Sequence, residues 1–252
     1  MTPGLRDIAV IGGGCYGTFY AGQLAQARDR GKLAYRRVLV VDRDPACQAA
    51  MDLAPRDDRE LVTAEWGEFL ARFLAGSGSP DGFDDAIVPS PLMPHLMGSW
   101  LEENARAQWP GRSIEQRPLP AVVGTPYEST GPDGTRYLSF ADWICPVHCI
   151  EPLTCPVIRG PRTWELSDTL TAFVENQRLA GPAIFLCRHQ AFGVGMFFAS
   201  EARQARNALV EAGRPGGEVS FVMGTVSRCH GAVSVLHLGP QGSEGAGDEQ
   251  QL

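Results

Sequence analysis

The chain contains very little lysine. Of its 22 lysines and arginines, Lys32 is the single lysine. It follows a predicted helix and has Arg28, Arg30, Arg36 and Arg37 as neighbours, a pattern typical of a solvated turn. We therefore do not expect a Schiff-base lysine, a phosphate-binding Walker lysine or a Tyr-x-x-x-Lys catalytic pair. Redox or proton chemistry would have to rely on histidine, cysteine, tyrosine or a metal.

Long apolar runs and an excess of basic charge are also missing. No run approaches the ~18 apolar residues of a membrane-spanning helix, and the net charge is −7, which argues against a nucleic-acid or anionic-membrane surface. A predicted core strand begins by residue 8, which leaves no room for a signal peptide. We expect a cytoplasmic protein without membrane insertion or a nucleic-acid partner. Its seven cysteines would then be reduced, and clustered cysteines there favour metal or redox chemistry over disulfides.

A glycine-rich motif lies between two apolar runs near the start of the chain. A predicted strand at 7–11 leads into the G-x-G-x-x-G sequence of residues 12–17, and a helical pattern follows at 16–29. The first glycine permits a tight turn, the second lets backbone approach a pyrophosphate, and the third lets the helix lie close on the strand. The first turn of the helix offers free N–H groups to phosphates. A second apolar strand at 37–42 ends on Asp42, whose carboxylate can accept hydrogen bonds from a ribose diol.

This segment resembles the Rossmann-type NAD(P)/FAD-binding superfamily, closely over residues 7–45 and loosely over 84–107. The resemblance implies a dinucleotide held by Gly12, Gly13, Gly14, Gly17, Asp42 and Arg43. Asp42 favours NAD over NADP because it would repel a 2′-phosphate, although the guanidinium of Arg43 could compensate. Flavin is less favoured because no second flavin-contact segment is evident, and S-adenosylmethionine because no acidic residue directly precedes the glycines. The alternative is a domain that keeps the fold and binds no nucleotide.

The order of predicted elements indicates an α/β fold: one doubly wound, mostly parallel sheet with a cysteine-rich insertion. The first half (1–107) contains strands at 7–11, 37–42 and 85–88 and helices at 16–29, 57–75 and 91–107. Residues 108–165 form the insertion, rich in proline, glycine and cysteine. The second half (166–238) contains helices at 167–178 and 199–212 and strands at 183–186, 218–223 and 232–238, the last two paired antiparallel. We expect the polar tail, 239–252, to be disordered.

Three cysteines gather within eleven residues of the insertion. Cys145, Cys149 and Cys155 have His148 and Glu151 between them, and neighbouring prolines stiffen the segment. Thiolates and imidazole suit zinc, and thiolates suit an iron–sulfur cluster. Cys187 or His189, at the end of a predicted strand, could complete the ligand set. Inert packing of reduced cysteines and thiol redox chemistry are the alternatives.

These features together predict an NAD(P)-dependent oxidoreductase of a small molecule, with a Cys-ligated metal or iron–sulfur centre near the nicotinamide crevice. His189 or His148 would handle a proton, and His95 is a weaker candidate. The alternatives are a non-enzymatic NAD(H) or redox sensor, or an iron–sulfur electron-transfer or assembly protein with a redox partner protein. A homodimer is left open. We expect Cys229 and His230 to be exposed residues of a hairpin turn.

Overall fold

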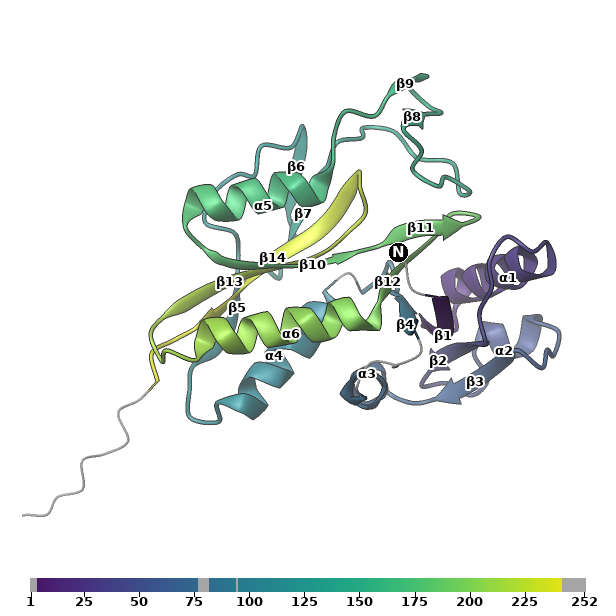
Figure 1. The fold of residues 1–252 in the computed structure, drawn as a ribbon, viewed down its shortest axis with the longest axis horizontal. Coiled ribbons are helices and arrows are strands. Elements are labelled where there is room, and N and C mark those ends of the chain that lie inside the picture. Colours follow the sequence, from purple (N-terminus) through teal and green to yellow (C-terminus); the bar gives the residue numbers. More distant parts are fainter. Residues whose placement is uncertain (1–3, 77–81, 94, 242–252) are drawn as a thin grey trace, which may run out of the picture.

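A computed structural model describes residues 4–76, 82–93 and 95–241 (Figure 1). These residues form two six-stranded sheets and a two-stranded ribbon. The first sheet has the order β11-β12-β4-β1-β2-β3. Its strands are β1 (Gly4–Ile11), β2 (Arg37–Asp42), β3 (Arg59–Thr63), β4 (Phe83–Val88), β11 (Arg188–Ala191) and β12 (Val194–Phe198).

Helices cover both faces of the first sheet. Strands β3, β2, β1 and β4 are parallel neighbours, and the apolar runs of β1 and β2 are buried on both faces, as parallel strands require. Ile8 and Val10 pack toward α1 (Cys15–Asp29) and α2 (Gln48–Asp52). Ala9 and Ile11 pack on the opposite side, in a core with α3 (Trp66–Ala75), α4 (Leu96–Gln108) and α6 (Ala199–Gly213).

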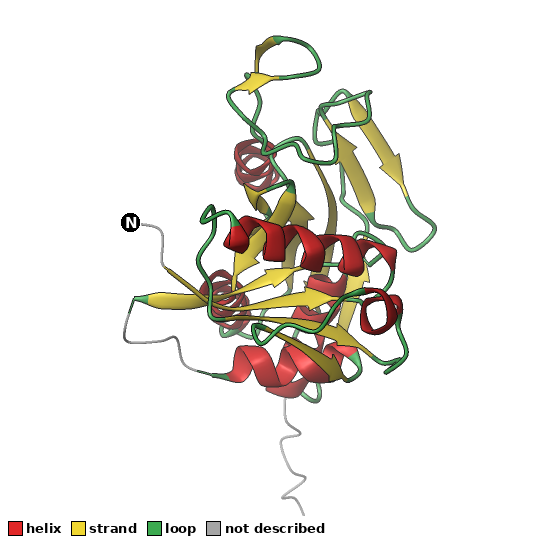
Figure 2. Ribbon diagram, turned by 90° about the vertical axis from the view of Figure 1, so that its right-hand side faces the viewer, coloured by secondary structure: helices red, strands yellow, loops and turns green. Residues whose placement is uncertain are grey.

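The second sheet is mostly antiparallel. Its order is β10-β13-β14-β7-β6, with β5 also paired to β14, and only β10 and β13 are parallel neighbours. The helix α5 (Leu166–Gln177) covers one face, while α4 and α6 lie on the other (Figures 1 and 2). The strands are β5 (Ile114–Arg117), β6 (Tyr127–Thr130), β7 (Arg136–Ser139), β10 (Ala180–Leu186), β13 (Val219–Val226) and β14 (His230–Leu238); β8 (Thr154–Cys155) and β9 (Gly160–Pro161) form the ribbon.

The prediction of one doubly wound, mostly parallel sheet is wrong. After β4 the first sheet continues with two antiparallel strands, β12 and β11, and the rest of the second half builds its own sheet. The physical reason is the short connection between β11 and β12, which can join only antiparallel strands. This hairpin adds to β4 in place of a further parallel strand. Strands β5, β6 and β7, from the predicted insertion, extend the second sheet beside β14.

The helix predicted at 57–75 is also wrong in its first part. Residues Arg59–Thr63 form β3, an edge strand paired in parallel with β2, and the helix α3 begins only at Trp66. The helix predicted at 91–107 likewise begins later, at Leu96. The antiparallel pairing predicted for the last two strands is confirmed. Of the predicted tail, residues 242–252 lie outside the described part of the chain, whereas Gly239 and Gln241 donate backbone hydrogen bonds to Ser113 and Gly216.

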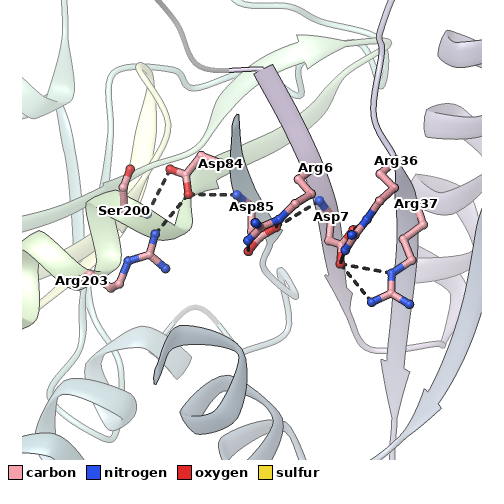
Figure 3. Close-up of polar contacts among 8 residues, drawn as sticks. All are labelled: Arg6, Asp7, Arg36, Arg37, Asp84, Asp85, Ser200 and Arg203. Atoms are coloured by element: carbon pink, nitrogen blue, oxygen red, sulfur yellow. Dashed lines mark hydrogen bonds and ion pairs between the residues drawn. The ribbon is translucent and has the colours of Figure 1, made fainter. Parts of the chain in front are cut away.

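A row of buried carboxylates joins the starting ends of β1 and β4, away from the glycine motif (Figure 3). Asp7 accepts hydrogen bonds from the guanidinium groups of Arg36 and Arg37 at 2.6–3.1 Å. The neighbouring Asp85 accepts from Arg6 and from the Asp7 backbone. Asp84 accepts from Arg203 and from the Ser200 N–H in the first turn of α6. These contacts fix α6 against the first sheet, and all three carboxylates are buried.

Candidate functional site

The glycine motif forms a tight loop between β1 and α1. Gly12 has a φ of +92°, a conformation that glycine adopts without strain. A Cβ on Gly17 would stand 1.7 Å from the carbonyl oxygen of Gly12, so helix and loop can meet this closely only with glycine there. A Cβ on Gly14 would meet nothing within 4 Å. In this loop Gly12 therefore permits the turn, Gly17 permits the close packing of the helix, and Gly14 lies beside open space.

The first turn of α1 is suited to an anionic group. Gly14 is the N-cap, and in the described structure no side chain caps this end and no acidic residue occupies its first turn. The backbone N–H groups there and the positive end of the helix dipole favour a phosphate. Open space at Gly14 would let a pyrophosphate approach. On these observations the residues present fit the phosphates of a dinucleotide.

Asp42 lies directly against this loop. Its carboxylate accepts hydrogen bonds from the Gly13 N–H at 2.6 Å and from the Asp44 N–H at 2.9 Å. Because a carboxylate can accept about four hydrogen bonds, lone pairs remain for a ribose diol. Arg43 is exposed beside it. The sequence-predicted nucleotide residues are thus brought together at the ends of β1 and β2, as the carboxyl ends of parallel strands require.

A cavity of about 480 Å³ opens next to the glycine loop, between the two sheets. Its walls come from α1, the segment after β4, the β11–β12 hairpin, β7 and the turn between β13 and β14. Ser90 belongs to this wall, and its hydroxyl oxygen would lie 3.9 Å from a Cβ on Gly12. The cavity and the glycine loop are therefore adjacent, and Ser90 lies between them.

His189 lines this cavity, and one of its two ring nitrogens is already hydrogen-bonded to another residue. Its Nδ1 lies 2.7 Å from the backbone oxygen of Cys149. A carbonyl can only accept, so Nδ1 carries the proton and the neutral ring keeps a lone pair on Nε2. A Cβ on Gly195 would stand 3.0 Å from that Nε2, so any side chain at this position would crowd the nitrogen. In the neutral ring, Nε2 is therefore the nitrogen that can accept a proton.

The other histidine candidates lie outside the cavity wall. His148 is exposed and its Nδ1 lies 2.8 Å from the side-chain nitrogen of Gln23, which donates to it. Its ring also stacks on Phe19 of α1. His95 precedes α4 and lies 3.8 Å from the carboxylate of Asp133. Of the three, His189 is the one that faces the cavity.

Three of the predicted cysteine ligands, Cys145, Cys149 and Cys155, lie in the segment 143–156, here called the cysteine loop, which contacts the β11–β12 hairpin. The fourth, Cys187, lies between β10 and β11. Cys155 is buried, Cys145, Cys149 and Cys187 are partly buried, and all four are free thiols. Among the described residues, no three His, Cys, Asp or Glu side chains are arranged to hold a metal ion. The arrangement in this structure therefore does not fit a metal centre, and metal binding stays a prediction from sequence.

Burial keeps several of these thiols protonated at neutral pH. Desolvation raises the pKa of Cys187 to about 12, and the nearby carboxylate of Glu151 acts in the same direction. Burial, with Cys149 and Cys155 nearby, also raises the pKa of Cys145. Thiols that hold their protons are weak nucleophiles. Neither residue is prepared for thiolate chemistry.

The expectation that Cys229 is an exposed turn residue is wrong. It is buried, burial raises its pKa to about 11, and its sulfur accepts a hydrogen bond from the indole of Trp164 at 3.3 Å. The hairpin turn is folded against the cysteine loop, where the Glu151 carboxylate accepts from the Arg228 backbone. The adjacent His230 is exposed, as expected, but it lines the cavity.

Tyr20, Ser90 and His230 are among the cavity residues that sequence reasoning missed. A usable signal existed for Ser90, because it follows a strand whose carboxyl end faces the glycine loop. Tyr20 lies less than two helical turns into α1. The sequence pattern does not show that this face of the helix lines a cavity. His230 reaches the cavity only through the contact between the two sheets, which no local pattern predicts.

Within the described residues, every helix is too short or too polar to cross a membrane. No curated protein and no solved structure matches the chain. A family model described as "uncharacterized protein, C-terminal domain" (AF_1314_C) matches residues 97–239. That range begins in α4 and contains the second sheet, the cysteine loop and His189, but not the glycine loop. Because the match covers more than half of its residues, the chain belongs to the AF_1314_C family.

Proposed function

We propose that the protein is an NAD(H)-dependent oxidoreductase of a small molecule. The observation that carries this proposal is the adjacency of the glycine loop and the cavity, with Ser90 between them. Gly12, Gly13, Gly14 and Gly17 would hold the pyrophosphate at the first turn of α1, and Asp42 the adenosine ribose. A cavity of about 480 Å³ is large enough for a reacting ring and a small substrate.

His189 has the chemistry that such a reaction needs from the protein. When bound, the dinucleotide takes up or supplies a hydride. In the oxidation direction His189 Nε2 accepts the hydroxyl proton of the substrate, and in the reduction direction the protonated ring returns it. The Cys149 carbonyl keeps the proton on Nδ1 in both directions, so Nε2 is the nitrogen that gains and loses the transferred proton. Tyr20 and Ser90 line the same wall and help to position the substrate.

Calorimetric titration with NAD⁺, NADH and NADP⁺ tests the proposal. We expect saturable binding at one site per chain, with NAD(H) bound more tightly than NADP⁺, because Asp42 accepts from a 2′-hydroxyl and repels a 2′-phosphate. The variant Asp42→Ser should bring the affinities for NAD(H) and NADP⁺ closer together by strengthening NADP⁺ binding. Binding of none of the three nucleotides would contradict the proposed function. Tighter binding of NADP⁺ would contradict only the role of Asp42.

A further inference from the structure

The cavity beside the glycine loop is chemically selective. Its described wall contains no Asp, Glu, Lys or Arg. The polar groups that it does present are hydroxyls, one thiol and the two imidazoles of His189 and His230. Most of the remaining wall is aliphatic side chain, proline or glycine. A ligand in this cavity would therefore meet hydrogen-bonding groups but no opposite charge.

The titratable groups of the wall are also biased toward their uncharged forms. Burial raises the pKa of Tyr20, and Tyr16 and Cys187 add to that shift. His230 is exposed over part of its surface, and desolvation of the rest lowers its pKa; Glu151 opposes that shift, and His189 adds to it. At neutral pH both side chains are thus neutral, the phenol as a donor and the imidazole as a donor and acceptor. The same low-polarity surroundings would disfavour charge on a bound molecule.

We propose that this cavity takes an uncharged, predominantly apolar small molecule that carries a hydroxyl or carbonyl group. An ionised ligand would lose its hydration and find no counter-charge on the described wall, which weakens its binding. A neutral alcohol or carbonyl loses little and can bond to His189, His230 or Tyr20. The role of this molecule as a hydride donor or acceptor rests on the proposed function; its charge class rests on the cavity alone.

Three probes of one size test the charge class: benzyl alcohol, benzoate and benzylamine, the last a cation at neutral pH. Calorimetry or ligand-detected NMR at pH 7 should give a dissociation constant for benzyl alcohol at least about tenfold below those of the two ions, a difference of about 1.4 kcal/mol. Equal or tighter binding of either ion would overturn the proposal. So would the absence of saturable binding of benzyl alcohol.

A matched pair of variants assigns the binding to this cavity. Tyr137 lines it and is 39 % exposed, whereas Tyr127, on the adjacent strand β6, is 45 % exposed and is not part of its wall. Tyr137→Arg should strengthen benzoate binding at least about fivefold, since it adds the missing counter-charge, and Tyr127→Arg should leave it unchanged. Equal effects of the two variants would overturn the assignment.

The two proposals fail separately. A protein that binds NAD(H) but prefers benzoate would contradict the charge class and leave the proposed function standing. A protein that prefers benzyl alcohol but binds no dinucleotide would contradict the proposed function and leave the charge class standing. Circular dichroism and melting temperature of both arginine variants show whether their folds are intact.

Discussion

At the scale of single residues, a substitution at Gly14 should weaken nucleotide binding without lowering the stability of the fold. A Cβ there meets nothing within 4 Å, and its φ of −74° is negative, so the backbone does not require glycine. We expect Gly14→Val to keep the melting temperature of the wild type and to weaken NAD(H) binding by about a hundredfold or more, because the side chain occupies the space that the pyrophosphate needs.

The control for this variant is Gly22→Ala, two turns along α1, where a Cβ also meets nothing within 4 Å. Gly22→Ala should leave both the melting temperature and the affinity for NAD(H) close to their wild-type values. Unchanged affinity in a folded Gly14→Val protein would mean that these glycines serve only the turn and that no nucleotide binds at this loop.

Gly17 carries the opposite prediction. Because a Cβ at this position would lie 1.7 Å from the Gly12 carbonyl oxygen, Gly17→Ala must push α1 away from β1. We expect a loss of about 2–4 kcal/mol in unfolding free energy, measured by urea denaturation. A loss below about 0.5 kcal/mol would show that the helix yields without cost.

At the scale of elements, the cysteine loop acts through its backbone as well as its thiols. The Cys149 carbonyl fixes the tautomer of His189, and a Cβ on Gly193 would stand 2.1 Å from the Val147 carbonyl oxygen. The loop and the β11–β12 hairpin are therefore in close contact. This packing gives the loop a structural role that does not depend on a metal.

Metal analysis decides the sequence-based hypothesis for this loop. The hypothesis expects one zinc ion or iron–sulfur cluster per chain in protein prepared without oxygen, lost in Cys145→Ser, Cys149→Ser and Cys155→Ser but kept in Cys15→Ser, an exposed cysteine in the glycine loop. Ligation and folding would be linked, so the melting temperature should fall with the metal content. Wild-type protein with seven titratable thiols and no bound metal would contradict the hypothesis.

Local patterns predicted some of these elements and not others. The β1–α1–β2 unit follows from an apolar strand, a glycine turn and a helical period, all within about 35 residues. Strand β3 was missed for two reasons. Its first residues, Arg59 and Glu60, are charged and so do not look like a buried strand. The strong helical period of Trp66–Ala75 follows shortly after, so the predicted helix was extended too far toward the N-terminus. The cavity was missed because its walls come from segments far apart in the chain, from Tyr20 to Ala232.

At the scale of the whole molecule, α4 and α6 join the two sheets. A single apolar core contains residues of the first sheet, such as Ile87, of both helices, and of the second sheet, such as Phe221. The sequence patterns predicted alternating strands and helices in both halves, but they do not report which sheet a strand joins. For this reason the fold class was predicted wrongly although most of the helices were found.

The buried carboxylate row predicts acid sensitivity of the whole fold. Burial alone would raise the pKa of Asp7, but its bonds to Arg36 and Arg37 outweigh burial, and the pKa lies below its usual value. Hydrogen bonds from Arg56 similarly lower the pKa of Asp58. The stabilisation from such groups is complete above their unfolded pKa of about 4 and is lost as the pH falls through the lower folded value. Unfolding free energy should therefore decline below about pH 4.

The variant Asp7→Asn tests this at neutral pH. Removing the charge takes the buried carboxylate from Arg36 and Arg37, which are themselves partly exposed, while Arg37 keeps its ion pair with Glu60. We therefore expect a loss of about 1–2 kcal/mol together with a flatter acid limb. The exposed Asp57→Asn should change stability by less than about 0.5 kcal/mol. Equal stability of the two variants between pH 3 and 7 would contradict the prediction.

The return of β12 to the first sheet has a consequence for synthesis on the ribosome. Strand β4 ends at Val88, but the strand that covers its outer edge begins only at Val194. While the intervening residues are translated, β4 presents an apolar, unpaired edge to solvent or to a chaperone, and such edges favour pairing with other chains. The first sheet can be completed only after the residues up to Phe198 have left the exit tunnel.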